Sequence, residues 1–331
     1  MFPTNGLGTR LFPFGAKKRV TLPPKFPHME TISHGDVNLL IIRNAEKKDQ
    51  DYLRSKYNFH PVHLDDLLSL IQRPKLDIEE DYLFFVLQFP EFNNKTNRIE
   101  SNEIDFFYSE KDIIVVINDP YPQFEAIIEK INKKKSEKER FFAKGTGLLI
   151  YQLIDDLVDS IFPLVEQIER GLELIDKQVF LEQAKNVVER ISFLRRNLIF
   201  FQTMVKPELA IFRGIEESDH KLITKELKTY FGNITDHFVK LWDRLEDAKE
   251  LTENLSTTVE TYLTLKTNET IKVLTMFSVV MLPLTLISGI YGMNLNMLPF
   301  ANHPLAFVMI AGIMLAIAYL MLAFFKYKRW I

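Results

Sequence analysis

A stripe of oxygen-bearing and small side chains runs through an uncharged stretch near the C-terminal end of the sequence. From Val273 to Phe325 there is no Asp, Glu, Lys or Arg. Steps of three and four residues return to one face of a helix, so side chains at this spacing form one continuous stripe along it. Along these steps the sequence places Asn268, Ile271, Thr275, Ser278, Leu282, Thr285, Gly289 and Gly292.

This stripe fits two structural roles, and its spacing leaves both open. Small residues let two helix backbones approach closely in lipid, so the stripe could be a helix-packing face. It could also be the wall of a pore, with Leu282 and Ile271 as apolar constrictions suited to gating by dewetting. Two membrane helices cannot enclose a channel, so a pore requires a ring of subunits.

The uncharged stretch divides into two segments that are long enough to cross a membrane. The first, Val273 to Ile290, has 18 residues, or about 27 Å of helix. The second, Pro304 to Phe325, has 22 residues, or about 33 Å of helix. Since a bilayer core is about 30 Å thick, we expect a hairpin with helix 1 at about 271–291, an outer loop at 292–303 and helix 2 at about 304–325.

The flanks of the hairpin predict its orientation. Lys326, Lys328 and Arg329 follow the second segment, with Tyr327 and Trp330 among them. Basic clusters beside a membrane end stay cytoplasmic, and aromatic residues favour the interface. We therefore expect a multi-pass protein of the cell membrane, in contact with lipid, whose N- and C-termini are both cytoplasmic.

The first 145 residues predict a cytoplasmic α/β domain with a largely antiparallel sheet. Short runs rich in β-branched and aromatic residues indicate strands, and Asn93-Asn94-Lys95 indicates a hairpin turn between two of them. Helical patches are expected at Asp65 to Ile71 and at Gln123 to Ile131. The expected strands are Val37 to Ile42, Tyr82 to Phe89, Ile104 to Tyr108 and Ile113 to Ile117.

Residues 146–270 predict a helical cytoplasmic domain and a stalk that leads into the hairpin at 271–331. Helical spacing begins at Gly147; Pro163 interrupts this pattern but need not end the helix. A second helix is expected from about Glu182 to Val205, ended by Pro207. From Ile234 to Leu282 there is no Gly or Pro, which predicts one helix from just after Asn233 to Ile290. A helix of that length needs lateral partners, so several copies are expected to pack together.

Composition argues against several classes of function. The 331 residues carry a net charge of −3 and no cysteine, which leaves no thiolate metal site and no global basic field for nucleic acid. The sequence has no Gly-rich phosphate loop, nucleophile elbow or His-rich metal pattern. We expect a protein that is not an enzyme.

The tip of the hairpin resembles the signature of the CorA family of magnesium/cobalt transporters. The similarity rests on Tyr291-Gly292-Met293-Asn294 and extends to Thr267-Asn268-Glu269, Pro283-Leu284-Thr285 and Ser288-Gly289-Ile290. The resemblance implies an α+β cytoplasmic domain, a long-helix stalk and a two-helix transmembrane hairpin in a ring-shaped homopentamer. It also implies a channel lined by the first membrane helix, with Gly292, Met293 and Asn294 as the selectivity filter. Mg²⁺ is the expected ion, with Co²⁺ and Ni²⁺ as further candidates.

Two departures from the family pattern affect the predicted cation sites. The outer loop Leu295-Asn296-Met297-Leu298-Pro299-Phe300 has no acid, so cations should be concentrated less at the mouth. Family members close when Mg²⁺ binds cytoplasmic acids between subunits, and Asn233 stands where an acid is expected. Asp155, Asp156 and Asp159 are the remaining candidates for regulatory Mg²⁺, although three acids on a helix are more often a solvated face.

Two other functions remain as alternatives. A ZntB-like zinc transporter would share this architecture, but that branch tends to vary the middle residue of the signature, so Met293 favours magnesium. A membrane-anchored scaffold without transport would leave the oxygen stripe without a purpose.

Overall fold

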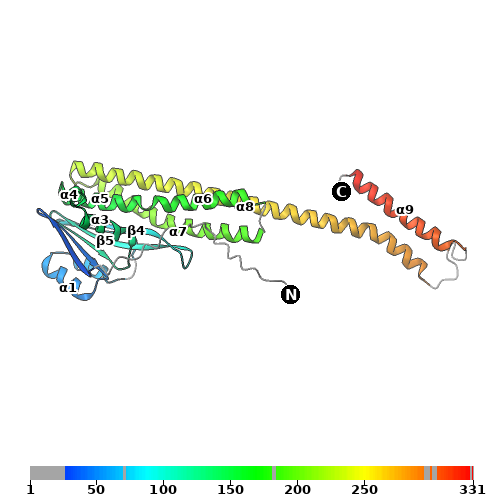
Figure 1. Ribbon diagram of the computed structural model, residues 1–331, viewed down its shortest axis with the longest axis horizontal. Coiled ribbons are helices and arrows are strands. Elements are labelled where there is room, and N and C mark those ends of the chain that lie inside the picture. Colours follow the sequence, from blue (N-terminus) through cyan, green and yellow to red (C-terminus); the bar gives the residue numbers. More distant parts are fainter. Residues whose placement is uncertain are drawn as a thin grey trace. The chain divides into compact units, whose positions relative to one another are not determined.

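The computed structural model describes residues 27–69, 72–180, 184–293, 299, 304–328 and 330. The chain divides into two compact units, Met1–Ser256 and Thr257–Ile331. Helix α8 (Lys225–Tyr291) contributes to both. Within the first unit, a sheet has α1 on one side and a layer of longer helices on the other (Figure 1).

Six strands form one sheet in the order β1-β2-β6-β5-β4-β3. All neighbouring strands are antiparallel except β2 and β6, which run parallel, so the prediction of a largely antiparallel sheet is confirmed. The four expected strands are present as β2 (Val37–Arg43), β4 (Tyr82–Asn93), β5 (Arg98–Ser109) and β6 (Asp112–Ile117). Two strands that the sequence patterns did not indicate, β1 (Met29–His34) and β3 (Lys75–Ile78), form the edges.

The predicted hairpin turn joins β4 to β5, where Asn93 pairs with Arg98. The Asn93 side-chain Oδ1 accepts hydrogen bonds from the backbone N–H groups of Lys95 (2.9 Å) and Thr96 (3.3 Å). Asn97 takes the left-handed conformation at φ 54°, which asparagine tolerates better than most residues. The asparagines therefore build this turn directly.

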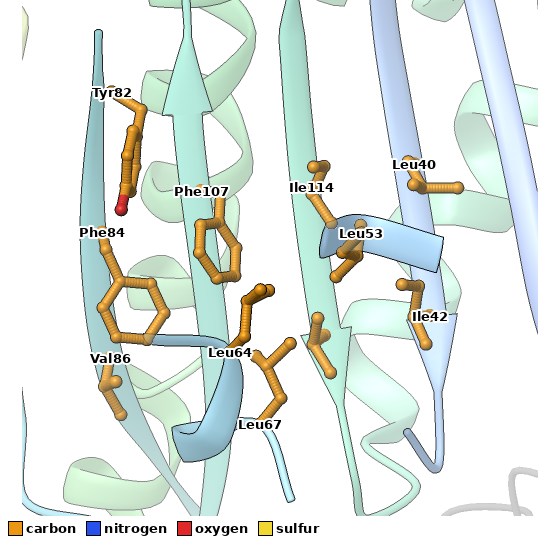
Figure 2. Packing of buried hydrophobic residues seen from close by; sticks show 11 residues of the cluster. Leu40, Ile42, Leu53, Leu64, Leu67, Tyr82, Phe84, Val86, Phe107 and Ile114 are labelled. Carbon is orange, nitrogen blue, oxygen red and sulfur yellow. The ribbon is translucent and has the colours of Figure 1, made fainter. Parts of the chain in front are cut away.

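One face of the sheet is covered by α1 (Lys47–Lys56) and α2 (Pro61–Asp66). Figure 2 shows Leu53, Leu64 and Leu67 above the aromatic and aliphatic side chains of β4, β5, β6 and β2, all of them buried. The helix expected at Asp65–Ile71 is instead α2, which begins earlier because His60 caps it and Pro61 starts it. It ends at Asp66, so that expectation was wrong; Leu70 and Ile71 lie outside the described residues.

Asp105 is a buried acid in this core. It lies on β5 between the cross-strand neighbours Val86 and Val116 and is only 2% exposed. Its Oδ1 atom is buried without a hydrogen-bond partner among the described residues. Burial, followed by the nearby charge of Glu103, raises the pKa of Asp105 well above its usual range.

Replacing Asp105 by asparagine is expected to stabilise the protein above neutral pH. A carboxyl whose folded-state pKa is raised contributes its full stability below the unfolded pKa and loses it as pH rises through the folded pKa. The amide of the variant cannot ionise, so Asp105→Asn should gain about 1–3 kcal/mol over wild type at pH 8 and much less at pH 5. Urea unfolding at both pH values measures this, with the exposed Asp36→Asn as the matched control. A gain that does not grow with pH would show that Asp105 stays neutral or is already paired.

The opposite face of the sheet is covered by helices, and a proline stands at the start of one of them. These helices are α3 (Pro122–Lys133), α4 (Lys135–Phe142), α5 (Thr146–Asp159), α6 (Phe162–Gln178) and α7 (Ala184–Glu217). Pro163 stands in the first turn of α6, where its missing N–H costs nothing, so the chain breaks there into two helices. The sequence pattern left open whether one helix passes Pro163, and in the structure the two helices are separate.

Pro207 lies inside α7, so the predicted helix end there was wrong. Proline removes one helical hydrogen bond, but buried residues on both sides, Met204 and Phe212 among them, anchor the helix to the core. Glu208, 1% exposed, accepts a hydrogen bond from the backbone N–H of Gln88 on β4 at 2.5 Å. Tertiary contacts therefore outweigh the local cost of the proline.

Helix α8 begins at Lys225, earlier than predicted, so Gly232 and Asn233 lie within it. Its first turn is capped by Thr224, whose Oγ1 accepts a hydrogen bond from the Leu227 N–H at 3.2 Å. Leu241, Leu245 and Ala248 are buried along one face of this helix.

The two expected membrane helices are present as the last part of α8 and as α9 (Ala306–Tyr327). Both pass the length and composition requirement for a membrane span, and their most apolar windows are not buried by any described part of the chain. Exposed apolar helices of this kind require lipid or other copies of the chain around them.

Candidate functional site

Helix α8 is continuous through this region, and the predicted stripe lies on one face of it. All of its members from Asn268 to Gly289, as well as Gly292 just beyond the helix, are exposed in the single chain. The half-exposed positions fall elsewhere, at Met276, Val280, Pro283, Leu284, Ile287 and Tyr291. At about 100° per residue, this second set is centred roughly 170° from the centre of the stripe.

Helix α9 has its own less exposed set, which recurs at the same three- and four-residue spacing. It consists of Ile310, Met314, Ile317, Met321 and the buried Phe325. Because the end of α8 and α9 form one compact unit, these two sets mark the faces that the helices turn toward each other. The oxygen stripe therefore faces away from α9 and is not its packing surface.

The hydroxyl groups of the stripe have a defined direction. Ser278 Oγ donates to the Leu274 carbonyl and Thr285 Oγ1 donates to the Met281 carbonyl, both at 2.9 Å. Each hydroxyl hydrogen is thus used within the helix, and the oxygen lone pairs remain as acceptors. Ser278, Leu282, Thr285 and Gly289 line one shallow groove that ends at Met293. Water molecules around a cation present hydrogens outward, so this groove offers them suitable acceptors.

The signature begins where α8 ends. The backbone N–H of Gly292 still bonds to the Ser288 carbonyl at 2.9 Å, and the N–H of Met293 bonds to the Ile290 carbonyl at 3.2 Å. A Cβ added to Gly292 would lie 3.1 Å from the Ser288 oxygen, so any larger residue there would make this turn shift by a few tenths of an ångström. Asn294 and the loop residues Leu295 to Leu298 and Phe300 lie outside the described residues.

Tyr291 has a role that the sequence analysis missed. Its hydroxyl donates a hydrogen bond to the carbonyl of Pro299 at 3.1 Å. This bond joins the end of α8 to Pro299 within the expected outer loop. In the sequence, this role could have been suspected from a tyrosine at a helix end followed by a loop that contains proline.

The predicted regulatory residues are only partly brought together. Asn233 Nδ2 lies 3.3 Å from Asp155 Oδ1, and it also donates to the Tyr151 hydroxyl at 3.2 Å. His237, which the sequence analysis did not single out, has Nδ1 3.6 Å from Asp159 Oδ1 and 3.8 Å from Asp155 Oδ1. His237 lies one helical turn after Asn233 on α8 and faces acids of α5. That spacing from Asn233 could have indicated it from the sequence.

Asp156 is separate from this cluster and faces Arg140 at 3.8 Å. Burial, followed by the charge of Asp159, raises the pKa of Asp155. In the part of the chain that the structure describes, no group of three or more His, Asp or Glu side chains has metal-binding geometry. Within one chain, the cluster of Asp155, Asp159, Asn233 and His237 is therefore at most an incomplete set of cation ligands.

The basic cluster follows α9. Lys326 is in its last turn, and the N–H of Lys328 bonds to the Phe324 carbonyl at 3.0 Å. The Trp330 ring stacks on Phe325 with a centroid distance of 5.7 Å. Arg329 lies outside the described residues. Cationic and aromatic side chains at one helix end are typical of a membrane interface.

Comparison with known proteins agrees with this geometry. Residues 35–329 match the family model of the CorA-like Mg²⁺ transporter protein. The cobalt/magnesium transport protein CorA of Thermotoga maritima is 29% identical over 83% of this chain and 78% of its own length. The putative metal ion transporter YfjQ of Bacillus subtilis is 30% identical over 86% of this chain and 87% of its own.

A solved structure shows the same fold. The CorA magnesium transporter from Methanocaldococcus jannaschii superposes with a TM-score of 0.79 at 20% identity, covering 93% of this chain and 95% of that one. The family model spans most of the sequence, from the second strand to the end of the second membrane helix. The chain belongs to the CorA family of CorA-like Mg²⁺ transporter proteins.

Proposed function

We propose that this protein is a membrane channel for Mg²⁺ uptake, with Co²⁺ and Ni²⁺ as further candidate ions. The observation that carries the proposal is the uncharged oxygen stripe of α8, which faces away from α9 and leads to Gly292 and Met293. A stripe used only for packing within the hairpin would face α9. The names of the Thermotoga maritima and Methanocaldococcus jannaschii relatives support magnesium as the ion.

The channel requires several copies, with the stripes facing a common axis and α9 outside. The exposed apolar surface of α8 and α9 supports such an assembly, and the family resemblance supports five subunits. Native mass spectrometry in mild detergent tests this point. A monomer or an antiparallel dimer cannot enclose a pore, so either result would contradict the proposed channel.

The pathway suits an ion that keeps much of its water. Acceptor oxygens of Ser278 and Thr285 would bind water hydrogens, and Leu282 would narrow the path between them. The Asn294 amide, from beyond the described residues, would complete the outer mouth. With the basic helix end in the cytoplasm, the membrane potential drives entry and supplies about 4.6 kcal/mol per 100 mV for a divalent ion.

The proposal places each domain on one side of the membrane or within it. Residues 1–145 and 146–270 form the cytoplasmic part and its stalk, and 271–331 form the transmembrane hairpin with its cytoplasmic tail. Lys326 and Lys328 support this orientation, because basic residues beside a short span stay inside. Protease accessibility of the tail in sealed right-side-out vesicles tests it.

Ion flux into liposomes is the direct test of function. Purified protein should admit Mg²⁺ when the interior is negative, and uptake should stop when the potential is dissipated. Parallel measurements with Co²⁺, Zn²⁺ and Na⁺ separate magnesium transport from the zinc alternative. Zn²⁺ uptake without Mg²⁺ uptake would reverse the assignment of the ion.

Thr285→Val is expected to lower Mg²⁺ flux by about tenfold, or about 1.4 kcal/mol of barrier. Valine keeps the shape of threonine but removes the acceptor oxygen from every subunit. Thr270→Val is the matched control, since Thr270 makes the same bond to the helix, to Lys266 at 3.0 Å, but lies about 100° from the centre of the stripe. Equal losses in both variants would contradict the assigned pathway.

A further inference from the structure

A groove of about 780 Å³ lies in the first unit, between the β4–β5 hairpin and α7. It is bordered by the start of β5, by the loop after β6 and by α7 residues from Arg196 to Met204. Its volume falls in the range of small-molecule sites. The ion pathway does not use this groove.

Two arginines from different elements line the groove. Arg98 begins β5 and Arg196 lies on α7. Both are exposed, and neither has an ion-pair or hydrogen-bond partner within the described ranges. Two unpaired guanidinium groups beside one groove can bind phosphate oxygens in bidentate fashion.

The inner surface of the groove is built from buried polar groups. Asn197 is 3% exposed and its Oδ1 accepts a hydrogen bond from the Ile99 N–H at 3.1 Å. Its amide nitrogen has no partner in the described structure and can donate into the groove. Ser101 Oγ is buried and also unpartnered among these residues.

The groove carries acids as well as arginines. Glu91 is half-buried and accepts a hydrogen bond from the Asn102 amide at 3.1 Å. Glu100 is held by Asn93 and Thr96, and Asp119 is exposed in the loop after β6. Mixed charges of this kind disfavour a bare polyanion. They suit a phosphate chain that carries its own Mg²⁺, since the acids can bind the water ligands of the metal.

One aromatic ring completes the lining. Phe200 of α7 is 39% exposed and lies one turn from Arg196. An exposed ring at the edge of a polar groove offers a flat surface for a planar base. We infer that the groove between the β4–β5 hairpin and α7 binds a nucleoside polyphosphate as its Mg²⁺ complex, with Arg98 and Arg196 on the phosphates and Phe200 against the base.

Isothermal titration of the full-length protein tests this inference. ATP is added at constant saturating Mg²⁺, so that binding of Mg²⁺ itself makes no signal. Saturable binding is expected, and Arg196→Ala should weaken it by at least about tenfold. Arg195→Ala is the matched control, because Arg195 is the neighbouring exposed arginine of α7 and does not line the groove. Arg98→Ala should weaken binding as Arg196→Ala does, which guards against a folding defect in one variant.

Two further comparisons identify the ligand class. Tripolyphosphate with Mg²⁺ should bind more weakly than ATP with Mg²⁺, and Phe200→Ala should remove that difference while Ile199→Ala keeps it. Chelation of Mg²⁺ should weaken ATP binding. The inference is overturned if ATP with Mg²⁺ does not bind below about 10 mM, if Arg195→Ala and Arg196→Ala weaken it equally, or if tripolyphosphate binds as well as ATP.

Discussion

Gly292→Ala is expected to reduce Mg²⁺ uptake in liposomes to the level of protein-free vesicles. The added methyl group would lie 3.1 Å from the Ser288 carbonyl oxygen and 3.6 Å from that of Gly289. The carbonyl of Ser288 already accepts the Gly292 N–H, so the backbone of the last turn must move to relieve the contact. A shift there displaces Met293 and every residue that follows it into the outer loop. At the mouth of a narrow pathway, small displacements have large effects on rate.

The matched control for this variant is Gly312→Ala in α9. Gly312 has no atom within 4 Å of its added Cβ in the described structure, and alanine favours a helix more than glycine does. Both variants should assemble like wild type, since neither residue belongs to the core of the first unit. Full Mg²⁺ flux through the Gly292→Ala protein would contradict the assignment of the signature to the pathway.

The strands that the sequence predicted are those buried on both faces. β4 and β6 consist almost wholly of apolar residues because helices cover the sheet on both sides. The edge strands β1 and β3 carry polar or charged residues and are mostly half-exposed or exposed. An edge strand of this composition gives no period-2 signal, so its pairing appears only once its neighbour is placed.

The prolines show why helix ends were predicted less well than helix existence. Pro163 and Pro207 have the same local chemistry, yet one begins a helix and the other lies within one. The difference comes from long-range contacts such as the one between Glu208 and Gln88, which are 120 residues apart. Local sequence carries no information about such a partner.

The candidate pathway followed from spacing, because a helix converts a three- and four-residue step into one face without tertiary help. What spacing could not provide was the relation of that face to α9, which depends on how the two helices pack. The cluster around Asn233 was harder to predict from the sequence for a similar reason. His237 joins it only because α5 and α8 lie side by side, and Asp156, although adjacent to Asp155 in sequence, points to Arg140 instead.

Asn233→Asp is expected to make the channel more sensitive to closure by cytoplasmic Mg²⁺. The Asn233 amide lies beside Asp155, and His237 stands between Asp155 and Asp159. Converting the amide to a carboxylate would bring three acids to this surface, and hard cations prefer charged oxygens. We predict that the Mg²⁺ concentration for half-closure falls by about tenfold, equivalent to about 1.4 kcal/mol of binding free energy. Current across a bilayer, recorded against cytoplasmic Mg²⁺ concentration, measures the change.

Two further variants separate a local site from a general charge effect. Asn254→Asp adds the same charge to an exposed position of α8 away from the cluster and should leave the closure curve in place. The double variant Asn233→Asp with Asp155→Asn restores the original number of acids and should return the curve toward wild type. If the Asn233→Asp curve coincides with wild type, or if Asn254→Asp shifts it equally, the surface around Asn233 does not bind the regulatory ion. Coupling between positions 233 and 155, beyond the sum of the single effects, would instead place both at one cation site.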